Sequence, residues 1–453
     1  MTAAFIIAEY NPFHNGHEYH INMTKELLRP DAVVCVMSGH FTQRGSATVT
    51  DKWSRARMAL RAGADLVVEL HPVYACSSAE YFARGALLTA SALGMGGWLS
   101  FGAENTNLDV ISDIADILNN EPEQYKELLA VSLDGGAPFA AARQRALTGY
   151  YFDPHGGAAD AASSRARVSS REFAAILRGP NNILAIEYVR AIKSLSLPLT
   201  PFAVPRVSAR ANTVRPYEGG VVSHDAVPRV SAHHKQEPFL INKNYSTILS
   251  ATDIRDRLYA AQDDTDYIGA MPDYARALLA SEFSIGRGPV FDGAFFPLIS
   301  AIVKRGAPED LSGYRDVGEG LENRLYKTAL RAGSYAELID GAASKRYPKS
   351  RIRRILTAIM LGYDINTLLS LDPDSGPPYL RVLGFTAKGR QLLSHIEPEV
   401  PVITNYKKLI NASSRQREFM KLEARATDIY VTAFQNRGFN MAGQDFLRGP
   451  ARI

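Results

Sequence analysis

Short apolar runs alternate with amphipathic segments along the N-terminal part of the chain. Such continuous runs are typical of strands buried on both faces of a sheet, and they occur at 4–8 (AFIIA) and 32–37. A third strand is predicted at 65–70 (DLVVEL). Helices are predicted from apolar residues at helical spacing, at 17–28, 54–62 and 79–93. Strands in alternation with helices indicate βαβ units. The pattern therefore predicts an α/β domain with a Rossmann-like parallel sheet.

The alternation continues to about residue 259 and then fades. Further strands are predicted at 98–101 and 198–204, with a helix at 180–192. Beyond residue 259 the pattern predicts helices, at 274–282, 321–332, 335–338, 350–361 and 415–433. We therefore expect two domains, an α/β domain over 1–259 and a mainly α-helical C-terminal domain over 260–453.

Two inserted loops are expected within the first domain. Residues 153–170 are rich in Gly, Ala and Ser, which is typical of a loop. The heptapeptide AVPRVSA at 203–209 recurs at 226–232. Two copies do not make a repeat array, so we interpret them as a local duplication in a loop near 207–235.

Composition narrows the class of protein. A chain of 453 residues is too long for one ordinary core, and two or three domains are expected. A net charge of +4 excludes a polycation, and two cysteines exclude a disulfide framework or a zinc-type spacing. No apolar run reaches membrane-spanning length, and the N-terminus enters a strand pattern without the basic segment of a secretory leader. We expect a cytoplasmic enzyme without a membrane partner.

Two histidines flank a glycine directly after the first predicted strand. The segment Asn11-Pro12-Phe13-His14-Asn15-Gly16-His17 opens the helix expected at 17–28. A helix N-terminus attracts anions, and glycine lets the backbone approach a phosphate closely. His14 and His17 can donate hydrogen bonds to phosphate oxygens as charge develops. We interpret the segment as a nucleotide site with His14 and His17 as catalytic residues. Two surface histidines at a turn are the alternative.

A second candidate phosphate site closes the α/β region. Ser250 and Thr252 stand just before Arg255 at the start of a predicted helix. Hydroxyl and N–H groups there can hold the outer phosphates, and Arg255 can neutralise them. An ordinary N-cap made by Ser250 or Thr252 accounts for the same residues, so both interpretations stay open here.

Together the two motifs resemble those of the nucleotidylyltransferase superfamily. Over most of its length the chain resembles one branch, the bacterial tRNA(Met) cytidine acetate ligase family. The resemblance is carried by IIAEYNPFHNGHEYHI, MSGHFTQRG, DKWSRARMALRAGADLVVEL, SAEYFARGA, LSFGAE, PNNILAIEYVRAI and YLRVLGFTAKGR. It includes the C-terminal part of the chain, and it is therefore far more specific than either phosphate motif.

The resemblance implies an ATP-dependent, adenylate-forming ligase. In that reaction ATP and acetate form acetyl-adenylate and pyrophosphate, and the wobble cytidine of elongator tRNA(Met) takes the acetyl group to give N4-acetylcytidine. The enzyme must align acetate with the α-phosphate and stabilise negative charge. No compact carboxylate cluster marks a metal site in the sequence, so we expect Mg²⁺ to arrive with ATP.

The resemblance also assigns ATP-binding residues. The family's ATP-binding loop matches Ile7, Ala8, Glu9, Tyr10, Asn11, Pro12, Phe13, His14, Asn15, Gly16, His17, Glu18, Tyr19 and His20. Gly102 matches a nucleotide-contacting glycine, and Asn182 matches an ATP-binding asparagine that could instead cap a helix. A nucleotide-contacting arginine is expected after the next strand. Arg206 fits it by position, but Arg229 has the same local sequence, and we prefer Arg206.

Other charged residues lie at the expected ends of strands. Arg44 and the pair Asp51-Lys52 follow the second strand, where substrate or RNA could approach, although Arg44 could instead pair with Glu69. Glu9 and Glu104 could orient a histidine or hold a magnesium-bound water.

The second domain carries one basic cluster. Six cations fall within ten residues that contain no acidic residue: Lys345, Arg346, Lys349, Arg351, Arg353 and Arg354. We interpret this basic cluster as a tRNA-binding surface, with a solvated helix face as the alternative.

Two other functions stay open on the sequence. A small-molecule nucleotidylyltransferase shares both phosphate motifs but leaves the basic second domain without a role. A non-catalytic, ATP-responsive RNA-binding protein is the other, and the intact His14, Gly16 and His17 argue against it.

Overall fold

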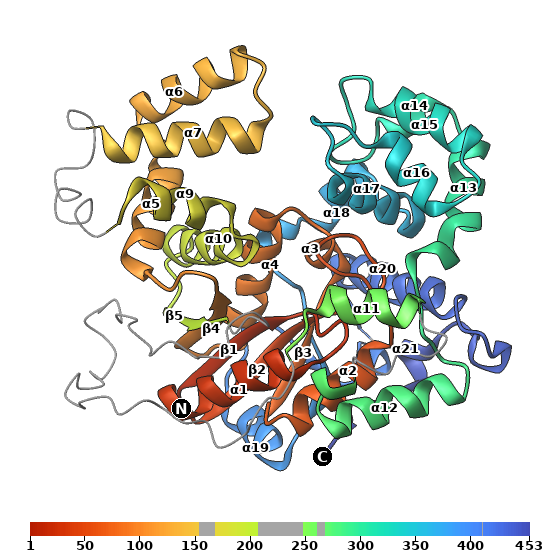
Figure 1. Cartoon of the computed structure of the whole chain (residues 1–453). Helices are drawn as coiled ribbons and strands as arrows, with labels where there is room; N and C mark the ends of the chain where they lie inside the picture. The colour runs from red at the N-terminus through yellow and green to blue at the C-terminus, as the bar shows by residue number, and fades with distance from the viewer. Residues whose placement is uncertain (154–167, 207–247, 261–267, 410) are drawn as a thin grey trace. The chain divides into compact units, whose positions relative to one another are not determined.

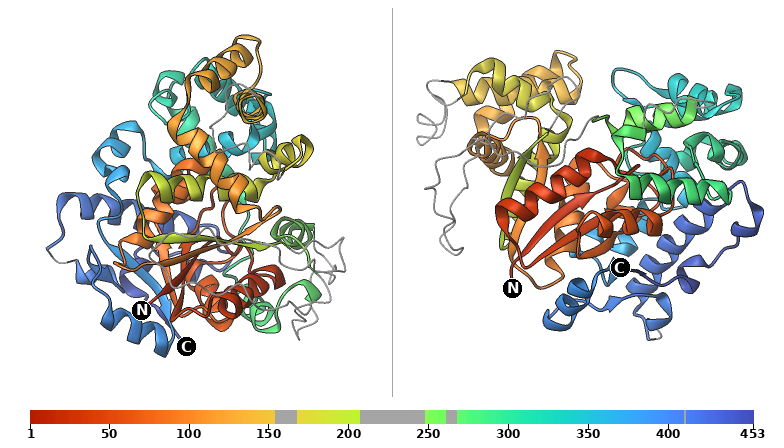
Figure 2. Two further views of the ribbon diagram at one scale, coloured as in Figure 1. Left: turned by 90° about the vertical axis from the view of Figure 1, so that its left-hand side faces the viewer. Right: turned by 60° about the horizontal axis from the view of Figure 1, so that its bottom comes forward.

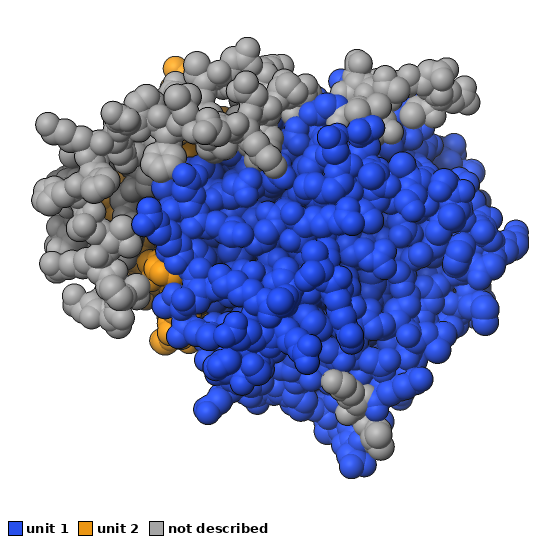
Figure 3. Space-filling model, turned by 90° about the horizontal axis from the view of Figure 1, so that it is seen from below, with its two compact units in different colours: residues 1–95, 245–453 blue, residues 96–244 orange. Residues whose placement is uncertain are grey.

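The computed structural model describes residues 1–153, 168–206, 248–260, 268–409 and 411–453 (Figure 1). The chain divides into two compact units, shown in different colours in Figure 3. Unit 1 combines Met1–Met95 with Tyr245–Ile453, and unit 2 is Gly96–Asn244. This division differs from the expected boundary near residue 260, because a strand from the C-terminal part joins the sheet of the N-terminal strands.

The sheet of unit 1 begins with three parallel strands. β1 (Ala3–Ala8) pairs with β2 (Ala32–Ser38), and β2 pairs with β3 (Leu66–Leu70). The strands of the C-terminal part extend it: β6 (Leu380–Phe385) runs antiparallel to β3, and β7 (Val402–Ile403) and β8 (Ala451–Arg452) pair with β6. The Rossmann-like α/β prediction is confirmed.

Helices cover the sheet of unit 1 where the pattern predicts them. α1 (Asn15–Leu28) and α2 (Lys52–Arg61) lie on one face (Figure 1 and Figure 2). Ile21 of α1 and Met58 of α2 share an apolar core with Ile6, Val33 and Leu383 of the strands. The short α3 (Pro72–Ala75) and the longer α4 (Ala79–Ser91) follow β3. This arrangement brings the loops after β1 and β2 to the carboxyl edge of the sheet, where ligands bind in such folds.

The C-terminal part of unit 1 is mainly helical, as predicted. Its helices are α11 (Ala251–Ala260), α12 (Asp273–Ser284), α13 (Phe296–Arg305), α14 (Pro308–Leu311), α15 (Leu321–Arg331), α16 (Tyr335–Ala342), α17 (Lys349–Leu361), α18 (Ile365–Leu371), α19 (Ala387–His395), α20 (Ser414–Val431) and α21 (Gln444–Leu447). Among the described helices, none is long and apolar enough by itself to cross a membrane. One bent pair, Lys349–Leu361 with Ile365–Ser375, passes that test by length and composition.

Unit 2 contains two parallel strands and five described helices. β4 (Gly97–Ala103) pairs with β5 (Leu199–Pro205) along its whole length. The helices are α5 (Leu108–Asn120), α6 (Glu123–Asp134), α7 (Phe139–Phe152), α9 (Ser170–Arg178) and α10 (Pro180–Ser194). Most of the two expected loops, and Arg229 with them, lie outside the described residues.

A buried ionic network joins β3, α2, β6 and α21 of unit 1. The Lys52 Nζ lies 2.8 Å from Glu69 Oε1 and 2.8 Å from Asp445 Oδ1. Arg381 Nη2 also lies 2.8 Å from Asp445 Oδ1. The buried Glu423 accepts a hydrogen bond from Tyr379 at 2.7 Å. The network therefore ties the C-terminal segments to the N-terminal strands.

Candidate active site

The first histidine of the predicted motif caps α1. His14 is the N-cap residue, and its Nδ1 accepts a hydrogen bond from the N–H of Gly16 at 3.0 Å. The His17 Nδ1 accepts in turn from the N–H of His14 at 3.3 Å, which completes a reciprocal capping box. A Cβ at Gly16 would lie 2.9 Å from the His14 Cε1, so any other residue there would displace the ring. Local backbone geometry therefore fixes both imidazoles.

These hydrogen bonds also determine where the ring protons lie. An Nδ1 that accepts a hydrogen bond carries no proton, so each neutral ring of His14 and His17 carries its proton on Nε2. The two rings stack with their centroids 3.8 Å apart and their planes 26° apart. The pair therefore has two Nε2–H donors in adjacent planes, an arrangement suited to two oxygens of one phosphate chain.

Aromatic side chains of the same loop support the second histidine. The Tyr10 ring packs edge-on to His17 with centroids 4.9 Å apart, and Phe13 lies 5.5 Å from it. Tyr10 and Phe13 are themselves buried, and the Tyr10 hydroxyl lies 3.3 Å from Cys35 Sγ on β2. Tyr10 and Phe13 thus act as packing residues of the predicted ATP-binding loop.

Arg255 reaches the histidine loop from α11. Its Nη1 donates to the carbonyl oxygen of Asn11 at 2.6 Å, and its Nη2 donates to the Thr252 hydroxyl at 3.0 Å. Ser250 serves as an N-cap, because its Oγ accepts from the N–H of Asp253 at 3.1 Å. The structure thus brings the second motif to the first, and the N-cap interpretation applies to Ser250.

A buried arginine that the sequence did not single out joins the loops after β1 and β2. Arg55 of α2 is fully buried. Its Nη1 donates to the carbonyl oxygens of Glu9 at 2.7 Å and Ser38 at 2.9 Å. Its Nη2 donates to Gly39, and its Nε donates to Thr50 at 3.3 Å. Arg55 therefore holds in place the backbone on which the candidate site is built.

The charged residues after β2 divide into an exposed one and two buried ones. Arg44 is exposed, and the alternative of an Arg44–Glu69 pair is wrong because Glu69 is buried with Lys52 and Arg381. Asp51 and Lys52 are also buried, which corrects the expectation that substrate approaches them.

The Glu9 carboxylate interacts electrostatically with Arg255, Arg44 and Arg55. Its Oε1 accepts from the N–H of Gln43 at 2.6 Å. Burial raises the pKa of Glu9, while this hydrogen bond and the charges of Arg255 and Arg44 oppose the rise.

Unit 2 brings two of its predicted residues, Gly102 and Arg206, together. Gly102 pairs with Val204 in the register of β4 and β5, and a Cβ at Gly102 would lie 3.4 Å from the Arg206 Cγ. Arg206 is exposed at the carboxyl end of β5, and its Nη1 donates to the Asn181 Oδ1 at 2.8 Å. Gly102 thus lies beside the Arg206 side chain near the carboxyl ends of β4 and β5.

Asn182 holds the loop that follows β4. It is fully buried, and its Oδ1 accepts from the N–H groups of Glu104 at 2.8 Å and Asn105 at 3.1 Å. The Glu104 Oε2 accepts from the N–H of Asn182 at 3.0 Å, so it binds the N-terminus of α10. Asn182 therefore contributes by fixing backbone, and Glu104 is engaged in the same contact.

Comparisons with known proteins identify the family. The model of the HIGH nucleotidyl transferase family matches residues 1–223 and 220–445. A tRNA(Met) cytidine acetate ligase of Acetivibrio thermocellus is 36% identical over 451 residues, which cover 99% of each chain. One from Thermoanaerobacter sp. is 36% identical over 446 residues, covering 98% of this chain and 97% of the relative. The chain belongs to the tRNA(Met) cytidine acetate ligase family.

A solved structure matches this member of the tRNA(Met) cytidine acetate ligase family throughout. The crystal structure of Thermotoga maritima TmcAL bound with alpha-thio ATP aligns with a TM-score of 0.83 at 28% identity. The alignment covers 100% of this chain and 99% of that chain. The predicted resemblance is confirmed.

In this tRNA(Met) cytidine acetate ligase family member, three of the six residues of the basic cluster bind partners in their own chain. Arg346 forms an ion pair with Glu319, and Lys349 Nζ lies 2.6 Å from Asp340 Oδ1. The Arg351 Nη2 donates to the carbonyl oxygen of Asp316 at 2.6 Å. Arg353 and Arg354 are half-buried, and Lys345 is exposed.

Metal ligands are sparse around the site. Within the described parts of the chain, no group of three or more His, Cys, Asp or Glu side chains could hold a metal ion. The carboxylates of Glu9 and Glu104 both accept backbone N–H groups.

Proposed function

We propose that this chain is an ATP-dependent ligase that acetylates the wobble cytidine of elongator tRNA(Met) to N4-acetylcytidine. The His14–His17 pair of Nε2–H donors at the N-terminus of α1 is the observation that carries the proposal. Family membership supplies the substrates, since the relatives bear the name tRNA(Met) cytidine acetate ligase.

The proposed reaction has two steps. An acetate oxygen attacks the α-phosphorus of ATP, so that acetyl-adenylate forms and pyrophosphate leaves. The N4 amine of cytidine then attacks the acetyl carbon, and AMP leaves while the amine loses a proton. His14 and His17 stabilise negative charge on the phosphate oxygens in the first step, and Arg255 neutralises the outer phosphates. Mg²⁺ enters with ATP in this proposal.

The deciding experiment is mass spectrometry of tRNA nucleosides. Elongator tRNA(Met) is incubated with the protein, ATP and acetate, and N4-acetylcytidine is expected only when all three are present. Pyrophosphate release that is independent of acetate would favour a small-molecule nucleotidylyltransferase. Binding of ATP and tRNA without either product would favour a non-catalytic protein.

Arg206 is proposed to contact ATP, and its replacement tests this. Arg206→Ala should weaken ATP binding about 10- to 100-fold, because a hydrogen bond to a charged group contributes about 1.5–3 kcal/mol. Isothermal titration with ATP measures the effect. Arg171→Ala, at an exposed arginine of α9 in the same unit, is the matched control. A large loss in Arg229→Ala with none in Arg206→Ala would reverse the assignment.

A further inference from the structure

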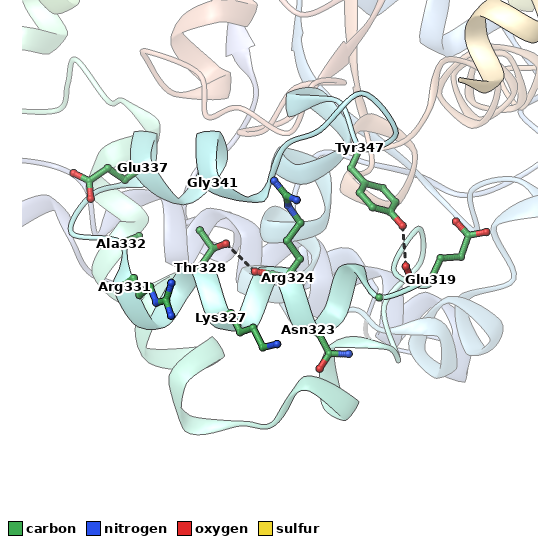
Figure 4. A pocket seen from close by; sticks show the side chains of 11 residues that line it. Glu319, Asn323, Arg324, Lys327, Thr328, Arg331, Ala332, Glu337, Gly341 and Tyr347 are labelled. Atoms are coloured by element: carbon green, nitrogen blue, oxygen red, sulfur yellow. Dashed lines mark hydrogen bonds between the residues drawn. The ribbon is translucent and has the colours of Figure 1, made fainter. Parts of the chain in front are cut away.

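A groove of about 720 Å³ opens on the helical part of unit 1, away from the histidine loop in sequence. Figure 4 shows that Arg324, Lys327 and Arg331 reach it from one helix, α15. Residues three and four apart share one face of a helix, so these three cations form a single row. All three side chains belong to exposed residues.

The acidic residues of the groove are already engaged. Glu319 forms its ion pair with Arg346, and the Glu337 carboxylate accepts from the N–H of Gly333 at 3.0 Å and the hydroxyl of Ser334 at 3.1 Å. These contacts neutralise one carboxylate and bind the other to the start of α16. Neither carboxylate is therefore held by a cation of the α15 row.

The three cations of the α15 row differ in their contacts. Arg324 donates to the carbonyl oxygens of Ala342 and Ala343, each at 2.8 Å. Among the residues that the structure describes, Lys327 and Arg331 form no side-chain hydrogen bond or ion pair, although both line the groove. They stand four residues apart, which is about 6 Å along the helix axis. The groove thus presents two exposed cations, Lys327 and Arg331, on one face of α15.

We propose that this groove binds the phosphodiester backbone of the tRNA through Lys327 and Arg331. The proposal rests on the proposed function and gives its RNA substrate a binding surface. Three of the residues that line the groove are cations of α15, and Tyr347 is its one aromatic residue. Contacts of Lys and Arg to phosphates position a nucleic acid without reading its sequence.

The basic cluster at 345–354 differs from the α15 row because half of its residues already have partners. Arg346, Lys349 and Arg351 have partners within unit 1, and binding RNA would require them to exchange those contacts. Lys327 and Arg331 require no such exchange. The α15 row therefore contributes more to RNA binding than the basic cluster does.

The double variant Lys327→Ala/Arg331→Ala tests the groove. Binding of an elongator tRNA(Met) transcript is measured by filter binding at several salt concentrations. We expect roughly tenfold weaker binding, with the slope of log affinity against log salt reduced by about 0.7–0.9 per lost phosphate contact. The matched control is Lys304→Ala/Arg305→Ala, which removes two exposed cations from the end of α13. That control should bind like the parent.

A second measurement separates this proposal from the proposed function. Acetate-dependent pyrophosphate release without tRNA should be the same in the parent and the groove variant. If the parent acetylates tRNA and the groove variant binds tRNA with the parent's affinity and salt slope, the groove proposal alone fails. An equal loss in the α13 control would also overturn it, because the effect would then follow from net charge. If the parent releases no pyrophosphate, the proposed function fails.

Discussion

His14→Asn is expected to slow acetate-dependent pyrophosphate release by about 10²–10³ while leaving the protein as stable as the parent. Asparagine is among the best N-cap residues, so it can still accept the hydrogen bond from the N–H of Gly16. It lacks the Nε2–H that the imidazole holds in a fixed direction. The substitution therefore removes the proposed phosphate donor and keeps the cap.

A comparison of His14→Asn with His14→Ala separates the effect on catalysis from the effect on stability. His14→Ala removes the cap as well, and it should cost a further 0.5–2 kcal/mol, approximately, in the free energy of unfolding. His17→Ala should show a similar loss of rate, because His17 supplies the second donor. His395→Asn, at an exposed histidine of α19, is the matched control and should be neutral. Near-normal rates in both His14→Asn and His17→Ala would contradict the proposed site.

The sequence predicts the N-terminal half of the sheet well because its signals are local. β1 and β2 are almost entirely apolar, β3 has Glu69 among its apolar residues, and each strand is buried along nearly its whole length. β6 is not predicted, although the strand is buried, and it contains Arg381. That arginine is tolerated only because Asp445 and Glu69 compensate it, and neither partner is near it in the sequence.

The candidate site also combines residues that a local sequence signal reveals with residues that only the fold reveals. The turn from β1 into α1 makes His14 and His17 predictable, since the capping box uses residues three positions apart. Arg55 gives a weaker signal, because it looks like an ordinary helical cation. Its function in the fold becomes visible only when the carbonyl groups of Glu9 and Gly39 meet its guanidinium.

The second large effect is expected at Lys52. Lys52→Met should lower the free energy of unfolding by about 3–5 kcal/mol, since it breaks the buried ion pair with Asp445 and leaves Arg381 to compensate that carboxylate. The side chain of Lys52 is 1% exposed, as is that of Asp445, and Glu69 is 2% exposed, so water cannot replace the lost ammonium group. Urea unfolding at neutral pH measures the loss.

The double variant Lys52→Met/Glu69→Gln tests which partner of Lys52 causes the loss of stability. Burial raises the pKa of Glu69 to about 8, and repulsion from Glu423 adds to the rise. Glu69→Gln should therefore be mild at neutral pH, since the parent side chain already holds a proton there. Lys52→Met/Glu69→Gln should therefore be about as unstable as Lys52→Met alone at neutral pH, because Asp445 is the charged partner that loses the ammonium group. A full cycle of variants measures the coupling between the two positions, which should be small.

The dependence of stability on pH gives an independent test of Glu69. A carboxyl group with a higher pKa in the folded state than in the unfolded state binds more protons when folded. Its contribution is complete below the unfolded pKa of about 4.3 and is lost as pH rises through about 8. The parent should lose this part of its stability between those values, and Glu69→Gln should not. Equal pH profiles for the two proteins, together with an unaffected Lys52→Met, would show that the network contributes little to folding.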